Sequence, residues 1–226
     1  MYSSQIVDLC LLALFGFIQN LAIEPGCLPH FELTRCVDIL VMYTKILKPD
    51  IRFMSLYTLS LLVQVIPFEK QGVLILEKEV IGEYIDILTT AVSSPDLAAR
   101  KVYGDLVIPA DDILRLVKQL WYIEPNRHTV ASFLSSLIFP LETCLRNGNE
   151  DQQKAAMDLL WTVISDPSVL IQITAGDIHI DFKLLEGLAD GSCDTSESVH
   201  LMTSCVLYKI RPECIKGKLS VLSIDS

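Results

Sequence analysis

The chain has 226 residues, of which 28 are acidic and 18 are basic, so its formal charge is −10 at neutral pH. Hydrophobic residues make up 51% of the chain and charged residues 20%. This balance excludes an intrinsically disordered protein, because disorder requires low hydrophobicity and a high density of charge. It also argues against a nucleic-acid-binding protein, because contacts with phosphate need clustered Lys and Arg side chains. The length suits one large domain or two small ones.

The first apolar segment, residues 6–23, predicts a buried helix. It contains Asp8, Gln19 and Asn20, which are costly in a lipid bilayer, and no basic residue precedes it. A secretory signal peptide would require a basic segment and a small-residue cleavage site, and neither is evident. We therefore expect neither membrane insertion nor secretion.

Prolines recur at the ends of the apolar segments that follow. They are Pro25, Pro67, Pro109, Pro167 and Pro212, and successive prolines are 42, 42, 58 and 45 residues apart. Because proline lacks an amide hydrogen and clashes with the preceding turn, it ends a helix or begins the next one. A spacing near 42 residues is typical of stacked helical repeats and not of a sheet fold.

Two series of helices fit between these prolines. The first series follows turn and capping residues such as Asp50 and Asp96, because a carboxylate accepts the free amides of a first turn. This series comprises residues 51–65, 97–107, 152–164 and 195–210. The second series lies upstream of the first in each repeat, shows apolar residues three and four positions apart, and comprises residues 37–47, 81–92, 130–145 and 182–188. The longest interval holds an extra helix, residues 111–122.

Several of these segments resemble armadillo repeats. The resemblance lies in Leu76–Ile81, Ile85–Ala91, Ser93–Asp96, Thr174–Ile178, Leu184–Leu185, Gly191–Asp194 and Asn20–Ala22. It covers most of residues 5–212 and rests on recurrence of the pattern in register. It implies an all-α fold, a right-handed α-solenoid of about four armadillo/HEAT-like repeats. The ladder of Trp and Asn by which some armadillo proteins hold extended peptides is not reproduced, so nuclear localisation signals are not expected ligands.

This resemblance sets the expected domain organisation. Residues 1–212 would form the repeat domain, with an irregular insertion near residues 110–127, and residues 213–226 would form a C-terminal tail. Residues 6–23 would be the third helix of an incomplete repeat, and they are apolar on nearly all sides. Since a solenoid needs a polar cap at its end, we expect a fragment of a longer solenoid or a first helix covered by a partner.

The seven cysteines are scattered through apolar segments, and we expect most to be small buried residues of an intracellular protein. Cys205 in particular is expected in the core. Cys27, His30 and Cys36 have donor atoms suited to zinc, but a structural site usually has two close pairs of ligands, and only one pair is close. We therefore expect no metal and no cofactor.

Two further groups of polar residues have weak catalytic potential. Asp177 and Asp181 flank His179, and we interpret them as capping and turn residues. Cys193 has acidic neighbours, Asp194 among them, which disfavour a reactive thiolate. No nucleotide-binding, hydrolase or metalloprotease motif is present. We expect no enzymatic activity and no catalytic residues.

The fold class predicts a scaffold that binds one or more proteins. Stacked repeats expose their third helices as a concave surface, and aromatic residues on such helices are the usual anchors of interfaces. The residues expected to line this surface are Asn20, Arg52, Tyr103, Asp105, Lys154, Asp158 and Trp161.

Two alternatives to the scaffold stay open. The first is an inert structural segment of a larger solenoid protein, whose apolar ends would cause self-association of the isolated chain. The second is a thiol- or metal-dependent hydrolase on an all-α scaffold, which stoichiometric zinc or one fast-labelling cysteine would identify. We expect no nucleic acid and no membrane as partners, and an acidic solenoid fits the cytoplasm and the nucleus equally well.

Overall fold

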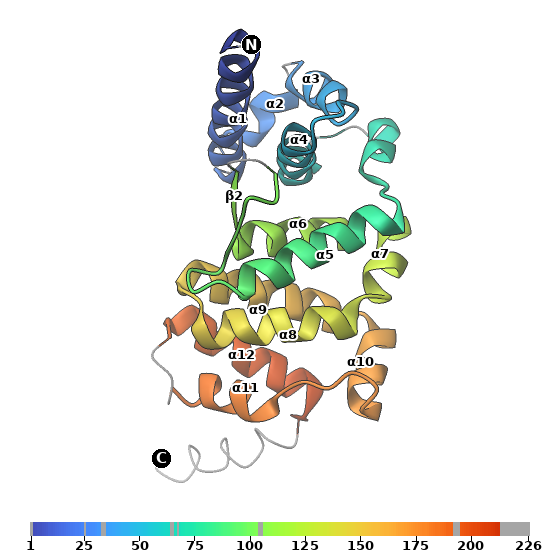
Figure 1. The fold of residues 1–226 in the computed structure, drawn as a ribbon. Helices are drawn as coiled ribbons and strands as arrows, with labels where there is room; N and C mark the ends of the chain where they lie inside the picture. Colours follow the sequence, from blue (N-terminus) through green and yellow to red (C-terminus); the bar gives the residue numbers. More distant parts are fainter. Residues whose placement is uncertain are drawn as a thin grey trace.

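The computed structural model describes residues 2–24, 26–32, 35–63, 66, 68–103, 106–191 and 195–212. Within these ranges the chain contains twelve α-helices, one 3-10 helix and one pair of short strands (Figure 1). The expected all-α class is therefore confirmed. No single helix in the described ranges is long and apolar enough to cross a membrane, although two bent helix pairs meet that test by length and composition.

The helices are arranged in two stacked layers (Figure 1). The first layer contains α4 (Pro49–Leu61), α6 (Ala110–Tyr122), α9 (Glu150–Ile164) and α12 (Glu197–Ile210), each packed against the next. The second layer contains α5 (Lys78–Val92), α8 (Leu134–Asn147) and α11 (Phe182–Ala189), which pack on α6, α9 and α12 respectively.

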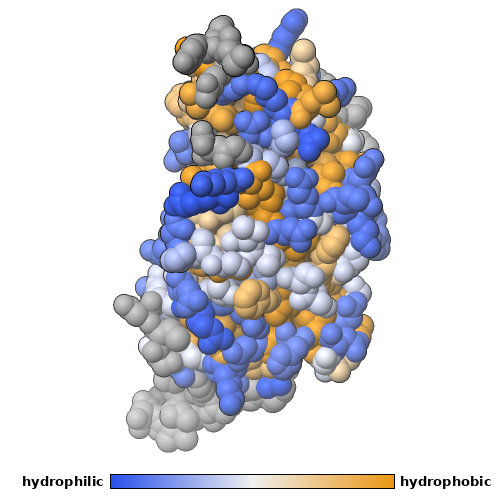
Figure 2. Space-filling view, in the orientation of Figure 1, coloured by the Kyte–Doolittle hydropathy of each residue, from blue (hydrophilic) through white to orange (hydrophobic). Residues whose placement is uncertain are grey.

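The other elements lie at one end and along one side of the stack. At one end, α1 (Tyr2–Ile23) and α3 (Cys36–Tyr43) pack on α4, and α2 (Leu28–Glu32) lies between α1 and α3. The 3-10 helix η2 (Phe68–Leu74) follows α4, and α7 (Glu124–Ala131) and α10 (Pro167–Ala175) lie along one side of the layers. Figure 2 shows polar side chains over much of the face in view, with hydrophobic ones between them both at the end formed by α1 to α4 and farther along the stack.

Helix α6 lies at the centre of the core. Its buried residues Ile113, Leu116, Val117 and Leu120 recur three and four positions apart and are at most 1% exposed. This broad apolar stripe lets α6 contact α4, α5 and α9 at once. The helix that the sequence assigns to an insertion near residues 110–127 is thus a regular member of the first layer.

Polar residues begin several helices in the way the sequence indicates. Asn149 and Gln152 form a reciprocal capping box at the start of α9, with two hydrogen bonds of 3.0 Å. Asp181 accepts the first free amides of α11, at 3.1 and 3.2 Å, so its interpretation as a capping residue is confirmed. Asp166 caps α10, and Pro167 lies in the first turn of that helix.

The helix predicted for residues 97–107 is wrong, because a β-hairpin occupies this segment. Strand β1 (Ala98–Arg100) pairs antiparallel with β2 (Val107–Pro109). Leu97 and Lys101, which flank β1, have φ angles of +50° and +59°, and this left-handed backbone is incompatible with a right-handed helix. The proline that ends β2 therefore precedes α6 and does not end a helix.

Replacing Lys101 by glycine should stabilise the protein. A left-handed backbone costs a residue with a Cβ atom about 1–2 kcal/mol, and glycine removes this strain at some cost in unfolded-state entropy. Lys101 is exposed, so little packing is lost. We expect the free energy of unfolding, measured by urea denaturation, to rise by up to about 1 kcal/mol. Arg100→Gly, at a strand position, should lower it, and a loss of stability in both variants would contradict the left-handed turn.

The cysteines are less buried than expected. Cys144 is buried, Cys27 and Cys36 are half-buried, and Cys10 and Cys205 are exposed. The prediction of a buried Cys205 is wrong because α12 is the last described helix of the first layer and turns one face to solvent. The expectations that concern Pro25, Pro67, Cys193, Cys214, Asp105 and residues 213–226 fall outside the described residues.

Candidate partner-binding surface

Three of the residues expected to bind a partner share one face of α9. Lys154, Asp158 and Trp161 are four and three residues apart, which places them on the same side of an α-helix. The opposite side carries Ala156, Leu159 and Val163, which are at most 1% exposed and anchor α9 in the core. Trp161 exposes 39% of its surface, so its indole is available to a partner.

Lys154 and Asp158 line a small pocket of about 230 Å³ between α6 and α9. Lys118, from α6, forms an ion pair with Asp158 across the pocket. Lys154 pairs with Glu150 one turn earlier at 2.6 Å, and Arg115 adds a third cation to the wall. Because these pairs are partly exposed to solvent, they add little to stability. Their effect is to fix a pattern of alternating charge on the surface.

A second pocket, of about 300 Å³, lies at the carboxyl ends of α6 and α9 and includes Trp161. Tyr122 of α6 forms another wall and is 56% exposed. Lys209, from α12, lies with Nζ 4.6 Å from the centre of the Trp161 ring and donates a hydrogen bond to Oγ of Ser165 at 2.9 Å. This geometry is that of a cation–π contact. Three successive helices of the first layer therefore contribute to one surface.

We call this region the α6–α9 surface. It comprises the cationic side chains of α6, the three α9 residues, and the neighbouring aromatic and basic residues, namely Arg115, Lys118, Tyr122, Lys154, Asp158, Trp161 and Lys209.

A half-buried polar network adjoins the α6–α9 surface. Tyr57 of α4 donates a hydrogen bond from its hydroxyl to Oδ1 of Asp112 at 2.8 Å. Arg115 pairs with Asp111 at 2.7 Å and with Asp112 at 3.3 Å. Burial raises the pKa of the Asp112 carboxyl, and burial together with the Asp112 charge raises the pKa of the Tyr57 phenol. The network therefore holds α4 on α6 and orients Arg115 toward the pocket.

Tyr103 and Arg52 belong to a different part of the molecule. Tyr103 is only 8% exposed, its ring centre lies 5.7 Å from that of Phe53, and its hydroxyl donates to Glu83. Burial raises the pKa of the Tyr103 phenol and that of the Tyr84 phenol. The nearby Arg52 charge partly offsets this rise in both pKa values. Neither Tyr103 nor Arg52 lines the two pockets of the α6–α9 surface. This aromatic cluster supports the packing of α4, α5 and the hairpin.

The remaining two expected residues are not brought to this surface. Asn20 is exposed on α1 and lines neither pocket. Asp105 lies outside the described residues. The structure thus gathers three of the seven expected residues, all of them on α9.

The α6 side of the surface was missed by the sequence analysis. Arg115, Lys118 and Tyr122 follow Asp111 at intervals of four, three and four residues, on the side of α6 opposite its buried stripe. The spacing of these polar residues is the sequence signal for the solvent-facing side of an amphipathic helix. The sequence predicts a helix for residues 111–122 but places it in an insertion, so it does not predict that this helix packs beside α9.

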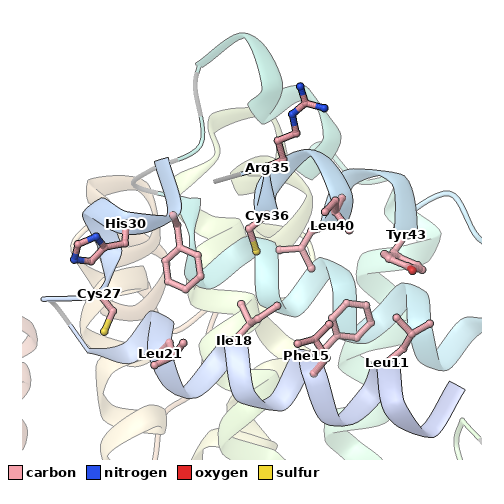
Figure 3. A pocket seen from close by; sticks show the side chains of 13 residues that line it. Leu11, Phe15, Ile18, Leu21, Cys27, His30, Arg35, Cys36, Leu40 and Tyr43 are labelled. Atoms are coloured by element: carbon pink, nitrogen blue, oxygen red, sulfur yellow. The ribbon is translucent and has the colours of Figure 1, made fainter. Parts of the chain in front are cut away.

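The residues weighed as metal ligands have other surroundings. Cys27, His30 and Cys36 lie around an apolar cavity between α1, α2 and α3, whereas Cys10 is exposed on α1 (Figure 3). Asp181 caps α11 and pairs with a basic residue of α8 at 2.9 Å. In the described ranges, no group of three or more His, Cys, Asp or Glu side chains is placed to hold a metal ion.

Comparison with known proteins gives no match. No protein-family model matches the chain, and no curated protein or solved structure does so either. A functional proposal therefore rests on the geometry of the described residues.

Proposed function

We propose that the chain is a non-catalytic scaffold of armadillo/HEAT-like repeats, wound as a right-handed α-solenoid, that binds a protein partner on the α6–α9 surface. The observation that carries the proposal is the exposure of Trp161. All other apolar residues of α9 are buried, yet this indole exposes 39% of its surface and lines a pocket. Exposed aromatic residues beside pockets are the usual energetic centres of protein interfaces.

The order of the helices supports a repeat array. In three successive pairs, α5–α6, α8–α9 and α11–α12, a second-layer helix precedes the first-layer helix on which it packs. The first-layer helices α6, α9 and α12 begin at residues 110, 150 and 197, which are 40 and 47 residues apart. Armadillo and HEAT repeats have periods of about 40–47 residues. The interval between the starts of α4 and α6 is longer, because the hairpin of β1 and β2 lies between α5 and α6.

The chemistry of the α6–α9 surface favours a protein over a polyanion. The anionic side chains of Asp151 and Asp158 lie among its cationic ones, and the whole chain carries a formal charge of −10, which would repel nucleic acid. A protein segment with an apolar anchor for Trp161 and Tyr122 and flanking charges of both signs would complement it. We propose that this takes place inside the cell, in the cytoplasm or the nucleus.

Removing the aromatic anchors should abolish partner binding without unfolding the protein. Tagged wild-type chain and the Trp161→Ala/Tyr122→Ala variant are used for affinity purification, and the recovered partner is then purified. We expect the Kd of the purified pair to rise at least about tenfold in the variant, because central aromatic anchors contribute over 1 kcal/mol each. The Tm of the variant should fall by only a few degrees, because both residues are exposed.

Phe139→Ala provides the matched control. Phe139 is 61% exposed, but it lies on α8 in the second layer. This variant should bind with an unchanged Kd. Equal losses of affinity in the control and in the test variant, or an unchanged Kd in both, would rule out the α6–α9 surface as the binding site.

A further inference from the structure

An apolar face of α1 is exposed at one end of the stack. Its exposed residues include Ile6, Val7, Leu9, Leu14 and Phe17, which show 50–60% of their surface, and the smaller Cys10 and Ala13. No charged side chain interrupts this face. Of the sixteen large hydrophobic residues exposed in the described ranges, eight belong to residues 6–47. Such a concentration of apolar surface marks an interaction site.

The orientation of α1 is set by specific contacts, so this face is fixed outward. Gln19 donates a hydrogen bond from Nε2 to Oγ1 of Thr58 on α4 at 2.9 Å. Asp8 pairs with Lys48 just before α4. Phe15, on the opposite side of α1, is only 1% exposed. A rotation of α1 that would hide its apolar face would break all three contacts.

An apolar cavity of about 610 Å³ adjoins this face, between α1, α2 and α3 (Figure 3). Leu11, Phe15 and Ile18 project from α1 into the cavity toward Leu40, while Arg35 points away from it. Leu14 both lines the cavity and belongs to the exposed face, so the two are continuous. An occupant of the face would therefore have room to insert a large apolar side chain.

The charge distribution favours a second copy of this chain as that occupant. Residues 1–63 contain five acidic and four basic residues, whereas the rest of the chain contains 23 acidic and 14 basic ones. Two copies that meet through α1 would bring together their nearly neutral ends and keep their acidic parts apart. Contact between the remaining parts of two copies would bring together regions of like net charge.

The α1 face is also complementary to itself. Around Ala13, the large residues Leu9 and Phe17 lie four positions before and after, and the small residues Cys10 and Gly16 lie three positions before and after. In an antiparallel crossing at Ala13, Leu9 of each copy would face Phe17 of the other. The small residues at the centre would let the helix axes approach to about 8–10 Å.

We propose that two copies of this chain associate through α1 in an antiparallel, two-fold symmetric contact centred on Ala13. The five large residues of the face would bury roughly 1,000 Å² over both copies, which is the lower limit for a specific interface. A two-fold contact of this kind closes on itself and gives a dimer, not a filament. It uses a surface separate from the α6–α9 surface and leaves that surface free.

Charge substitutions on α1 test the dimer. Sedimentation of the full chain between about 1 and 100 µM should show a monomer–dimer equilibrium. Leu9→Glu and Phe17→Glu should each weaken the dimer at least about tenfold and leave the circular dichroism spectrum and Tm unchanged. Leu201→Glu is the matched control, because Leu201 is 67% exposed on α12 at the other end, and this variant should still dimerise like the wild type.

A cysteine at the two-fold axis gives a geometric test that does not depend on dimer strength. Ala13→Cys in a Cys10→Ser background should form a disulfide-linked dimer under mild oxidation, because position 13 of one copy would face position 13 of the other. Ser198→Cys, exposed on α12, should not cross-link in the same background.

Four outcomes would overturn the proposal. The first is a wild-type chain that stays monomeric at every concentration, as expected if another segment or a lipid covers the face. The second is dissociation by Leu201→Glu but not by Leu9→Glu. The third is an open series of oligomers in place of a dimer, and the fourth is a dimer in which Ala13→Cys does not cross-link.

Discussion

Replacing Asn126 by leucine should lower the free energy of unfolding by about 3 kcal/mol or more. Asn126 is 1% exposed in α7 and holds the segment between η2 and α5. Its Oδ1 accepts from the amide of Leu76 at 2.9 Å, and its Nδ2 donates to the carbonyl of Leu74 at 2.6 Å. Leucine would leave both backbone groups buried without partners, at about 1–3 kcal/mol each.

Two further variants separate this effect from a general intolerance of substitution. Asn126→Asp keeps an acceptor for Leu76 but loses the donor to Leu74, so we expect a smaller loss in urea denaturation than with leucine. Asn147→Ala, at an exposed position in the last turn of α8, should change stability by less than about 0.5 kcal/mol. If Asn126→Leu were as stable as Asn147→Ala, the two backbone hydrogen bonds would not contribute to the fold.

Raising the pH above 10 should destabilise the protein steeply. Burial raises the pKa of the phenols of Tyr57 and Tyr84 above the ordinary value of 10.0. In the unfolded chain these phenols ionise near pH 10, whereas in the fold they stay protonated. Their contribution to stability is therefore complete below pH 10 and is lost as the pH rises beyond it, at up to about 1.4 kcal/mol per group and pH unit. Burial also raises the pKa of Cys144 from 9.0 to about 12, which adds a loss from about pH 9.

Urea denaturation at pH 8, 9, 10 and 11 measures this dependence. The double variant Tyr57→Phe/Tyr84→Phe should lose less stability between pH 10 and 11 than the wild type, because phenylalanine does not ionise. Tyr122→Phe, at an exposed position, should leave the slope unchanged. Identical slopes in all three proteins would mean that the buried phenols ionise as easily in the fold as in the unfolded chain.

Local patterns in the sequence were sufficient to predict most of the helices. The capping residue Asp181 and the turn and capping residues that precede 152–164 are signals that act within a few residues, and the structure follows both. The helix predicted for residues 97–107 is wrong because two residues there adopt left-handed backbone angles, and the spacing of side chains does not encode such angles. Apolar periodicity and capping residues therefore do not distinguish this hairpin from a helix.

The candidate surface was predictable only where one helix supplies it. Lys154, Asp158 and Trp161 share a face of α9 by spacing alone. The ion pair between Lys118 and Asp158 joins residues 40 positions apart, so it depends on α6 packing beside α9. Tyr103 was expected on a helix facing a partner, but it follows β1 and packs against Phe53, which lies on α4. These long-range placements follow from the packing of layers and not from local sequence.

The stacking of the helices has a consequence for how the protein opens. Because the first-layer helices pack mainly against their neighbours in the stack within the described ranges, loss of structure can start at either end without disrupting the centre. Amide hydrogens of α6 and α9 should therefore exchange with solvent most slowly, and those of α1 and α12 faster. The two hydrogen bonds that Asn126 makes with Leu74 and Leu76 join residues about 50 positions apart. Because such long-range contacts form slowly, their formation should limit the rate at which α1 to α4 pack on the other helices during refolding.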